Sequence, residues 1–133
     1  MIVRAAIGIV LNHHHEVLVA HRPAHAYKGG VWEFPGGKIE GGETDFIALQ
    51  RELAEEVGVQ VVTAEPFLSY RYDYPERQVQ LAVWLVTAFT GEAVGREGQE
   101  IKWVKLMELM HLETLAANQA IIKKLQRFLL IKR

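Results

Sequence analysis

The segment between residues 45 and 58 limits most strongly how this chain can fold. Apolar residues recur there at intervals of three or four positions, namely Phe46, Leu49, Leu53 and Val57. This spacing puts them on one stripe of an α-helix, and such a stripe has to be buried against other elements. Gly58 follows at the position where helices commonly end in a left-handed residue. The sequence therefore predicts an amphipathic helix that ends at Gly58 and covers one side of the core.

The opposite side of the same helix is acidic. Glu52, Glu55 and Glu56 stand at positions i, i+3 and i+4, so their carboxylates share one face. Carboxylates packed this closely repel one another, or take up protons, unless cations lie among them. Mg²⁺ suits such a face because it binds a few carboxylates and completes its shell with water and phosphate oxygens. A solvated surface is the commoner meaning of a glutamate-rich helix, but it would not require Gly37 and Arg51 at fixed offsets.

The rest of the chain consists mainly of expected strands. Residues 1–11 alternate in character and, with 16–22, indicate a hairpin across a turn at 12–15. Apolar residues at helical spacing indicate a last helix from about 118 to 130. We therefore predict an α+β fold with a mixed β-sheet sandwiched between helices, in a single domain spanning 1–133. The other strands are expected at 31–34, 59–62, 66–73, 77–90 and 101–106, with Pro35-Gly36-Gly37 stopping the first of them.

Composition excludes several kinds of function. Half of the 133 residues are apolar, which is enough for one sizeable core. Lysine and arginine total 15 against 16 acidic residues, so no excess charge would hold the chain on a nucleic-acid polymer or a membrane. The absence of cysteine removes thiolate catalysis and disulfides. The apolar start carries Arg4 and is far shorter than a membrane span. We expect a cytoplasmic monomer that acts on a small molecule.

Residues 37–59, GKIEGGETDFIALQRELAEEVGV, resemble the signature of the Nudix hydrolase family, the Nudix box. The pattern is Gly, five residues, Glu, seven residues, then Arg-Glu-aliphatic-any-Glu-Glu-any-Gly-aliphatic, and the chain matches it without departure. A chance match has a probability on the order of one in ten million or less. The resemblance implies hydrolysis of a nucleoside diphosphate linked to another group. It also implies that Mg²⁺, or Mn²⁺ as a substitute, is held by the Gly37 carbonyl and the carboxylates of Glu52, Glu55 and Glu56, with Arg51 completing the catalytic group.

Stretches outside the box resemble one branch of this family, the MutT pyrophosphohydrolases. They are HRPA (21–24), WEFPGGKIE (32–40), YDYPERQVQLAVWLV (72–86), GREGQ (95–99) and AANQAIIKKL (116–125). The resemblance implies that Glu97 joins the metal cluster and that Asn118 hydrogen-bonds an oxidised guanine base. It further implies that Phe34 and Arg77 lie around the base and that Arg22 lies near the phosphates.

Each of these residues also has an ordinary structural explanation. A loop glutamate such as Glu97 is usually only solvated, and Asn118 could cap the last helix, a role that asparagine fills well. Phe34 could belong to the core alone, and Arg22 and Arg77 could form surface ion pairs.

The chain also departs from the MutT branch at three positions. Tyr27 stands where that branch has histidine, Glu76 where it has aspartate and Tyr74 where it has phenylalanine. The departures bear on affinity and base preference, and leave the hydrolytic chemistry of the box unaffected.

The resemblance predicts an enzyme that cleans the nucleotide pool for DNA replication and repair by hydrolysing 8-oxo-dGTP and, more weakly, dGTP. Water activated by the metal would attack the β phosphorus and release a nucleoside monophosphate and pyrophosphate. Glu52 is the first candidate for the general base, and the sequence leaves the other glutamates open. An alternative is a Nudix enzyme for CTP or dCTP, although such relatives tend to have aspartate in place of Asn118. Another is a Nudix domain that senses a nucleotide without cleaving it, although such domains often lose box carboxylates.

Overall fold

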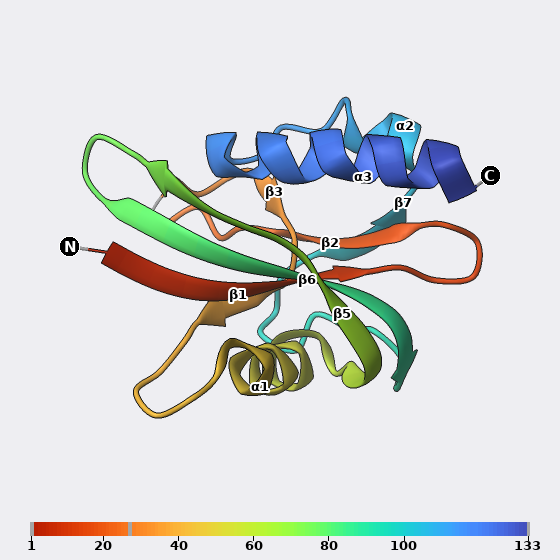
Figure 1. Ribbon diagram of the computed structural model, residues 1–133, viewed down its shortest axis with the longest axis horizontal. Coiled ribbons are helices and arrows are strands. Elements are labelled where there is room, and N and C mark those ends of the chain that lie inside the picture. Colours follow the sequence, from red (N-terminus) through yellow and green to blue (C-terminus); the bar gives the residue numbers. More distant parts are fainter. Residues whose placement is uncertain (1, 27, 133) are drawn as a thin grey trace.

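The computed structural model, which describes residues 2–26 and 28–132, is a layer of strands between two helices (Figure 1). Tyr27, one of the three departures from the MutT branch, lies outside the described residues. None of the described helices is long and apolar enough to span a membrane. In chain order the elements are β1 (Ile2–Val10), β2 (Val17–His21), β3 (Trp32–Glu33), β4 (Gly36–Lys38), α1 (Asp45–Val57), β5 (Gln60–Asp73), β6 (Gln78–Thr90), β7 (Ile101–Val104), α2 (Leu106–Leu109), the 3₁₀ turn η1 (Ala116–Asn118) and α3 (Gln119–Lys132).

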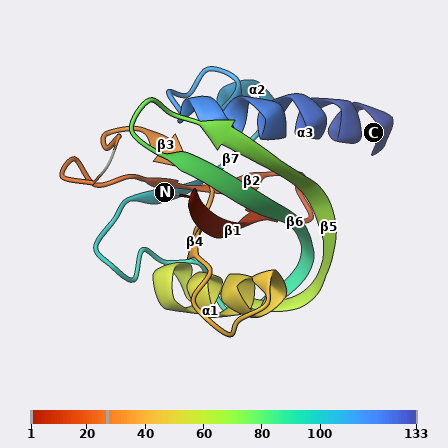
Figure 2. The ribbon, with the colours of Figure 1, turned by 60° about the vertical axis from the view of Figure 1, so that its left-hand side comes forward.

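The strands form two sheets. The larger has the order β4-β1-β6-β5 and is mixed, because β1 and β6 run parallel while β4 and β5 run antiparallel to their neighbours. The smaller has the order β3-β2-β7 and is antiparallel. Figures 1 and 2 show α1 and α3 on opposite sides of the strands. The predicted α+β fold, with a mixed sheet between helices, is confirmed.

Strand β1 is buried on both faces because a helix covers each side. Ala6 and Val10 pack in the cluster of α1, whereas Ile9 packs in the cluster that contains residues of α3. Leu49 and Leu53 of α1 are fully buried against the first face. Each such leucine contributes about 1.5–3 kcal/mol to folding. The alternation along β1 therefore fixes which side of the sheet each helix occupies.

Helix α1 begins and ends where its sequence indicates. The Thr44 hydroxyl caps its start by accepting a hydrogen bond from the Ile47 N–H at 3.1 Å. Gly58 ends it with a φ of 70°, a left-handed conformation, and its N–H donates to the Leu53 carbonyl. A side chain at this position would be strained, so the glycine defines the end of the helix.

β1 and β2 do not form the predicted hairpin. Apart from one isolated bridge between Leu11 and Val17, the two strands belong to different sheets. β1 is already paired with β4 on one edge and β6 on the other, and a strand has only two edges for hydrogen bonding. β2 therefore pairs with β3 and β7.

The segments 59–62 and 66–73 are one continuous strand, β5, and not two separate strands. Its register against β6 shifts around Thr63 and again between Pro66 and Leu68. Such bulges absorb residues that interrupt the alternation, and proline is tolerated because β5 is an edge strand. A long strand with bulges therefore looks like two short strands in the sequence.

Two further boundaries differ from the prediction. Gly36–Lys38, expected to be part of a turn, forms β4 and pairs with residues 5–7 of β1. The strand expected at 101–106 ends at Val104, because the short helix α2 begins at Leu106. The pairing of β4 matters for function, since it holds Gly37 beside α1.

Candidate active site

Strand β4 lies directly against the acidic face of α1. A Cβ on Gly37 would lie 2.2 Å from Oε2 of Glu52, so this carboxylate fills the space that a side chain would occupy. Gly36 has a φ of 151°, and a Cβ there would meet the carbonyl oxygen of Ala6 at 2.2 Å. Glycine at both positions therefore lets the backbone pair with β1 and still touch the Glu52 carboxylate.

Arg51 connects the carboxylates of this region. Its Nε and Nη2 donate to the two oxygens of Glu43 at 2.7 and 2.9 Å, and Nη2 also donates to the Lys38 carbonyl at 3.0 Å. Its Nη1 lies 2.9 Å from Glu52 and 3.4 Å from Glu55. The hydrogen bonds from Arg51 lower the pKa of Glu43 to about 2. Arg51 thus ties the turn before α1 to the helix and orients Glu52.

Glu56 faces inward and is strongly perturbed. Burial, and then a hydrogen bond shared with Glu52, raise the pKa of Glu56 to about 9, and the charges of Glu52, Glu33 and Glu97 add to the effect. These four side chains therefore form one acidic cluster, contributed by α1, β3 and the loop before β7. Without a cation, the cluster retains a proton at neutral pH.

Gln99 places Glu97 in this cluster. Its side-chain amide donates to the Glu56 carbonyl at 3.1 Å, and its side-chain oxygen accepts from the Glu97 N–H at 2.9 Å. The Arg96 N–H donates to the same Glu56 carbonyl at 2.9 Å. The loop is therefore fixed to the end of α1. The sequence analysis missed Gln99, although it is the last residue of the GREGQ stretch.

The acidic cluster suits a divalent cation once its proton leaves. As they stand, no three His, Cys, Asp or Glu side chains among residues 2–26 and 28–132 converge as a ready metal site. Arg51 holds Glu52 and Glu55, and the Glu55 side chain is 56% exposed. The hydrogen bond between Glu52 and Glu56 needs a proton that a cation can replace. Carboxylate and carbonyl oxygens are the ligands that hard divalent cations prefer.

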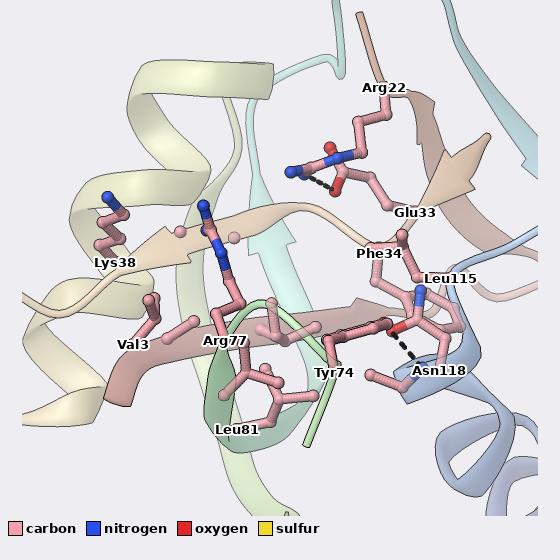
Figure 3. Close-up of a pocket in the computed structure, with 16 residues that line it drawn as sticks. Val3, Arg22, Glu33, Phe34, Lys38, Tyr74, Arg77, Leu81, Leu115 and Asn118 are labelled. Atoms are coloured by element: carbon pink, nitrogen blue, oxygen red, sulfur yellow. Dashed lines mark hydrogen bonds and ion pairs between the residues drawn. The ribbon is translucent and has the colours of Figure 1, made fainter. Parts of the chain in front are cut away.

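A cavity of about 190 Å³, partly open to solvent, is lined at one end by Gly36, Gly37 and Lys38, and Figure 3 shows the residues around it. Five residues that the sequence analysis assigned to the site meet in its wall, whereas Glu97 lines a different depression that includes His21 and His25. The five are Arg22, Phe34, Gly37, Arg77 and Asn118.

The two ends of the cavity differ in character. Figure 3 shows Lys38 and Arg77 on the side of α1, while Phe34, Leu115 and Asn118 gather near η1. Phe34 is 3% exposed and belongs to the core as well as to the wall. Asn118 is 6% exposed and is the last residue of η1, directly before α3. The arrangement can hold a molecule with an anionic part near Gly37 and a flat, apolar part near Asn118.

Glu33 is a second residue of this site that the sequence analysis missed. Its carboxylate lies 2.9 Å from Nη1 of Arg22, and both side chains line the cavity. Burial raises the pKa of Glu33, and the Arg22 guanidinium opposes the shift. A charged residue inside a short, partly buried strand was the available signal.

Fold and site together define a class of protein with an acidic, cation-compatible helix beside a cavity for an anionic small molecule. The chain belongs to the Nudix family, since the NUDIX domain model matches residues 1–126. Hydrolases of this family generally need divalent cations. The predicted resemblance is confirmed.

The relatives cover nearly the whole chain. An "8-oxo-dGTP diphosphatase" of Escherichia coli (strain K12) is 41% identical over 122 residues, which are 92% of this chain and 95% of the relative. A "CTP pyrophosphohydrolase" of the same organism is 34% identical over 97 residues, which are 73% and 72% of the two chains. A solved structure from work on MutT of Aliivibrio salmonicida and Vibrio cholerae has a TM-score of 0.81 and 37% identity, covering 94% of this chain and 97% of that chain.

Proposed function

We propose that this protein is a pyrophosphohydrolase that prefers 8-oxo-dGTP to dGTP and releases the nucleoside monophosphate and pyrophosphate. The observation that carries the proposal is the buried amide of Asn118 at the apolar end of a cavity whose other end reaches Gly37, the glycine that lies against the Glu52 carboxylate. The relative named 8-oxo-dGTP diphosphatase, which matches over nearly the full length of both chains, supports it. In this proposal a monomer acts on free nucleotides and so removes oxidised precursors before DNA replication.

Base discrimination would depend on hydrogen bonding at Asn118. Oxidation at C8 converts N7 of guanine from an acceptor into an N–H donor and adds a carbonyl. The Asn118 amide offers both an acceptor and donors, whereas an ionised aspartate would only accept. A mismatched buried donor or acceptor costs ~1–3 kcal/mol, so two such differences could give a preference of several hundredfold. Phe34 would provide an apolar wall for the ring.

The phosphates would lie between the cationic side chains and the acidic cluster. Arg22, Lys38 and Arg77 line the cavity and can neutralise phosphate charge. The Gly37 carbonyl and the carboxylates of Glu52, Glu56 and Glu97 would hold divalent cations, with Mg²⁺ expected and Mn²⁺ as a substitute. Glu55, which lies beside Arg51 and is largely exposed, would be the fourth carboxylate ligand and the one nearest to solvent. Bound cations would lower the pKa of water and neutralise charge on the phosphates.

The chemical step would be a substitution at the β phosphorus. A water oxygen adds there, the Glu52 carboxylate accepts a proton from that water, and the bond to the oxygen bridging the α and β phosphates breaks. The bridging oxygen leaves with the nucleoside monophosphate. Arg51 acts through Glu52, because its guanidinium holds this carboxylate at 2.9 Å, and so it is better described as a positioning residue.

Purified protein tested with Mg²⁺ against a panel of nucleotides, with products identified, addresses the proposal directly. Higher kcat/KM for 8-oxo-dGTP than for dGTP is expected, mainly through KM, because the base lies away from the reacting phosphorus. Asn118→Ala should lower kcat/KM for 8-oxo-dGTP much more than for dGTP, and so bring the two values together. Equal kcat/KM for 8-oxo-dGTP and dGTP in the wild type would rule out the preference for the oxidised base.

A second candidate is hydrolysis of CTP or dCTP. The relative named CTP pyrophosphohydrolase favours it, although that match covers a smaller part of both chains. The same panel separates the two candidates, since highest kcat/KM for CTP or dCTP would replace the first proposal while leaving the hydrolytic chemistry in place.

A further inference from the structure

Two tyrosines, Tyr70 of β5 and Tyr74 directly after the end of β5, hold the peptide groups of one residue, Ala117. The Tyr74 hydroxyl accepts a hydrogen bond from the Ala117 N–H at 3.0 Å. The Tyr70 hydroxyl donates to the Ala117 carbonyl. Ala117 is 3% exposed and directly precedes Asn118 in η1. The N–H and the carbonyl of Ala117, the residue before the proposed base-reading asparagine, are therefore both bonded to side chains at the end of β5 or directly after it.

The hydrogen bond from Ala117 N–H fills a need that the start of a helix creates. The first N–H groups of a helix have no partner within it, and Ala117 lies at the start of the η1–α3 segment. A side chain near in sequence usually accepts from such groups, but here the Tyr74 hydroxyl does so from 43 residues away. The position of η1 is thereby tied to the turn that follows β5.

The same tyrosine also fixes the turn that carries Arg77. The Tyr74 N–H donates to the Arg77 carbonyl at 2.8 Å, which closes the turn between β5 and β6. Figure 3 shows Tyr74 and Asn118 side by side at one end of the cavity, with Arg77 nearer its middle. Tyr74 therefore links the two segments that flank this end of the cavity.

We propose that Tyr70 and Tyr74 are positioning residues that hold η1 at a fixed distance from β5 and so place the Asn118 amide for base recognition. The role in recognition rests on the proposed function, whereas the hold on η1 does not. A phenylalanine in place of Tyr74 would have no hydroxyl to accept from the Ala117 N–H.

Tyr72 provides a matched control on the same strand. Tyr70 and Tyr72 point to the same side of β5 because successive side chains alternate. The Tyr72 ring packs 4.7 Å from that of Tyr74 and belongs to the margin of the same core cluster. Among the described residues, its hydroxyl has no hydrogen-bond partner. Tyr72→Phe therefore removes a hydroxyl from this face without touching η1.

The test compares Tyr70→Phe, Tyr74→Phe and Tyr72→Phe, each of which keeps its ring. In Tyr70→Phe and Tyr74→Phe, the ratio of kcat/KM for 8-oxo-dGTP to that for dGTP should fall about five- to tenfold, through KM, with kcat within about twofold. Tyr72→Phe should leave the ratio unchanged. In an Asn118→Ala background, Tyr74→Phe should no longer change the ratio, because the tyrosine acts through Asn118. A ratio within twofold of wild type in both folded Tyr70→Phe and Tyr74→Phe would overturn the proposal.

Hydrogen exchange separates this inference from the proposed function. Tyr74→Phe should speed exchange of the Ala117 amide by about tenfold or more relative to Tyr72→Phe, whatever the substrate. If the wild type does not distinguish the two nucleotides, the proposed function fails, and faster exchange alone would still support the hold on η1. Unchanged exchange at Ala117 in Tyr74→Phe would overturn that hold.

Discussion

Replacing Glu56 by glutamine should stabilise the cation-free protein at neutral and alkaline pH. Burial and the neighbouring carboxylates raise the pKa of Glu56 to about 9, against an ordinary value of 4.5. Between these values the folded chain retains a proton that the unfolded chain has lost. Stability therefore falls as pH rises from 4.5 to 9. Glutamine cannot ionise and keeps a donor for Glu52, so Glu56→Gln should remove this loss.

The expected gain in stability follows from the width of the pH interval over which only the folded chain keeps the proton. Each pH unit in which one proton is retained only by the folded state costs about 1.4 kcal/mol, so the three units between 4.5 and 7.5 set an upper limit of about 4 kcal/mol. Part of the raised pKa of Glu56 comes from its hydrogen bond and charge interaction with Glu52, so the gain falls below this limit if Glu52 moves away in the variant. We expect Glu56→Gln to raise the free energy of unfolding by about 2–4 kcal/mol at pH 7.5 and to change it little at pH 4.5.

Urea unfolding with a chelator present, at several pH values from 4.5 to 9, measures this difference. Glu55→Gln is the matched control, because Glu55 is on the same helix but 56% exposed, and it should change the pH dependence little. Mg²⁺ should stabilise wild type at pH 7.5 more than Glu56→Gln, since the cation relieves the same repulsion. An identical slope of stability against pH in wild type and Glu56→Gln would refute the reasoning.

Other predictions concern the chemistry and the glycine strand. Glu52→Gln should lower turnover by orders of magnitude in a folded protein, and near wild-type turnover would remove this glutamate from the mechanism. In ¹⁸O-labelled water the label should appear in pyrophosphate by mass spectrometry, whereas label in the monophosphate would mean attack at the α phosphorus. Gly37→Ala should reduce kcat strongly with little change in melting temperature, because its Cβ would displace the Glu52 carboxylate. Glu43, with a pKa lowered to about 2, should stabilise the fold above pH 4.5 and lose this effect as pH falls toward 2, so Glu43→Gln should flatten acid unfolding curves over that range.

Local periodicity made α1 and its acidic face predictable from sequence. The apolar stripe and Gly58 depend only on the 3.6-residue repeat and on the left-handed end of the helix, and both occur in the structure as expected. The relative positions of Glu52 and Glu56 follow from the same repeat. Such features need no knowledge of other parts of the chain.

Contacts between distant segments were the part that periodicity could not supply. Glu33 joins the acidic cluster, and Gln99 contacts the Glu56 carbonyl, only because the strand β3 and the loop before β7 reach α1. The hydroxyl of Tyr70 meets Ala117 across 47 positions of sequence. The hairpin prediction failed for the same reason, since β1 is paired on both edges by strands that come later. Each of these features depends on strand order, which a one-dimensional pattern does not contain.

The proposed catalytic groups and the proposed base-reading amide belong to different elements, and this separation would allow one box to serve different nucleotides. Glu52 and Gly37 belong to α1 and β4, whereas Asn118 belongs to η1, which directly precedes α3, and Figure 1 shows α1 and α3 on opposite sides of the strands. Under the proposed function, a substitution near η1 would therefore change which base fits without moving the carboxylates. Relatives named for 8-oxo-dGTP and for CTP are both similar to this chain, as such a division would allow. Substitutions at Asn118 or Tyr74 should therefore act on substrate preference, and substitutions at Glu52 should slow every substrate alike.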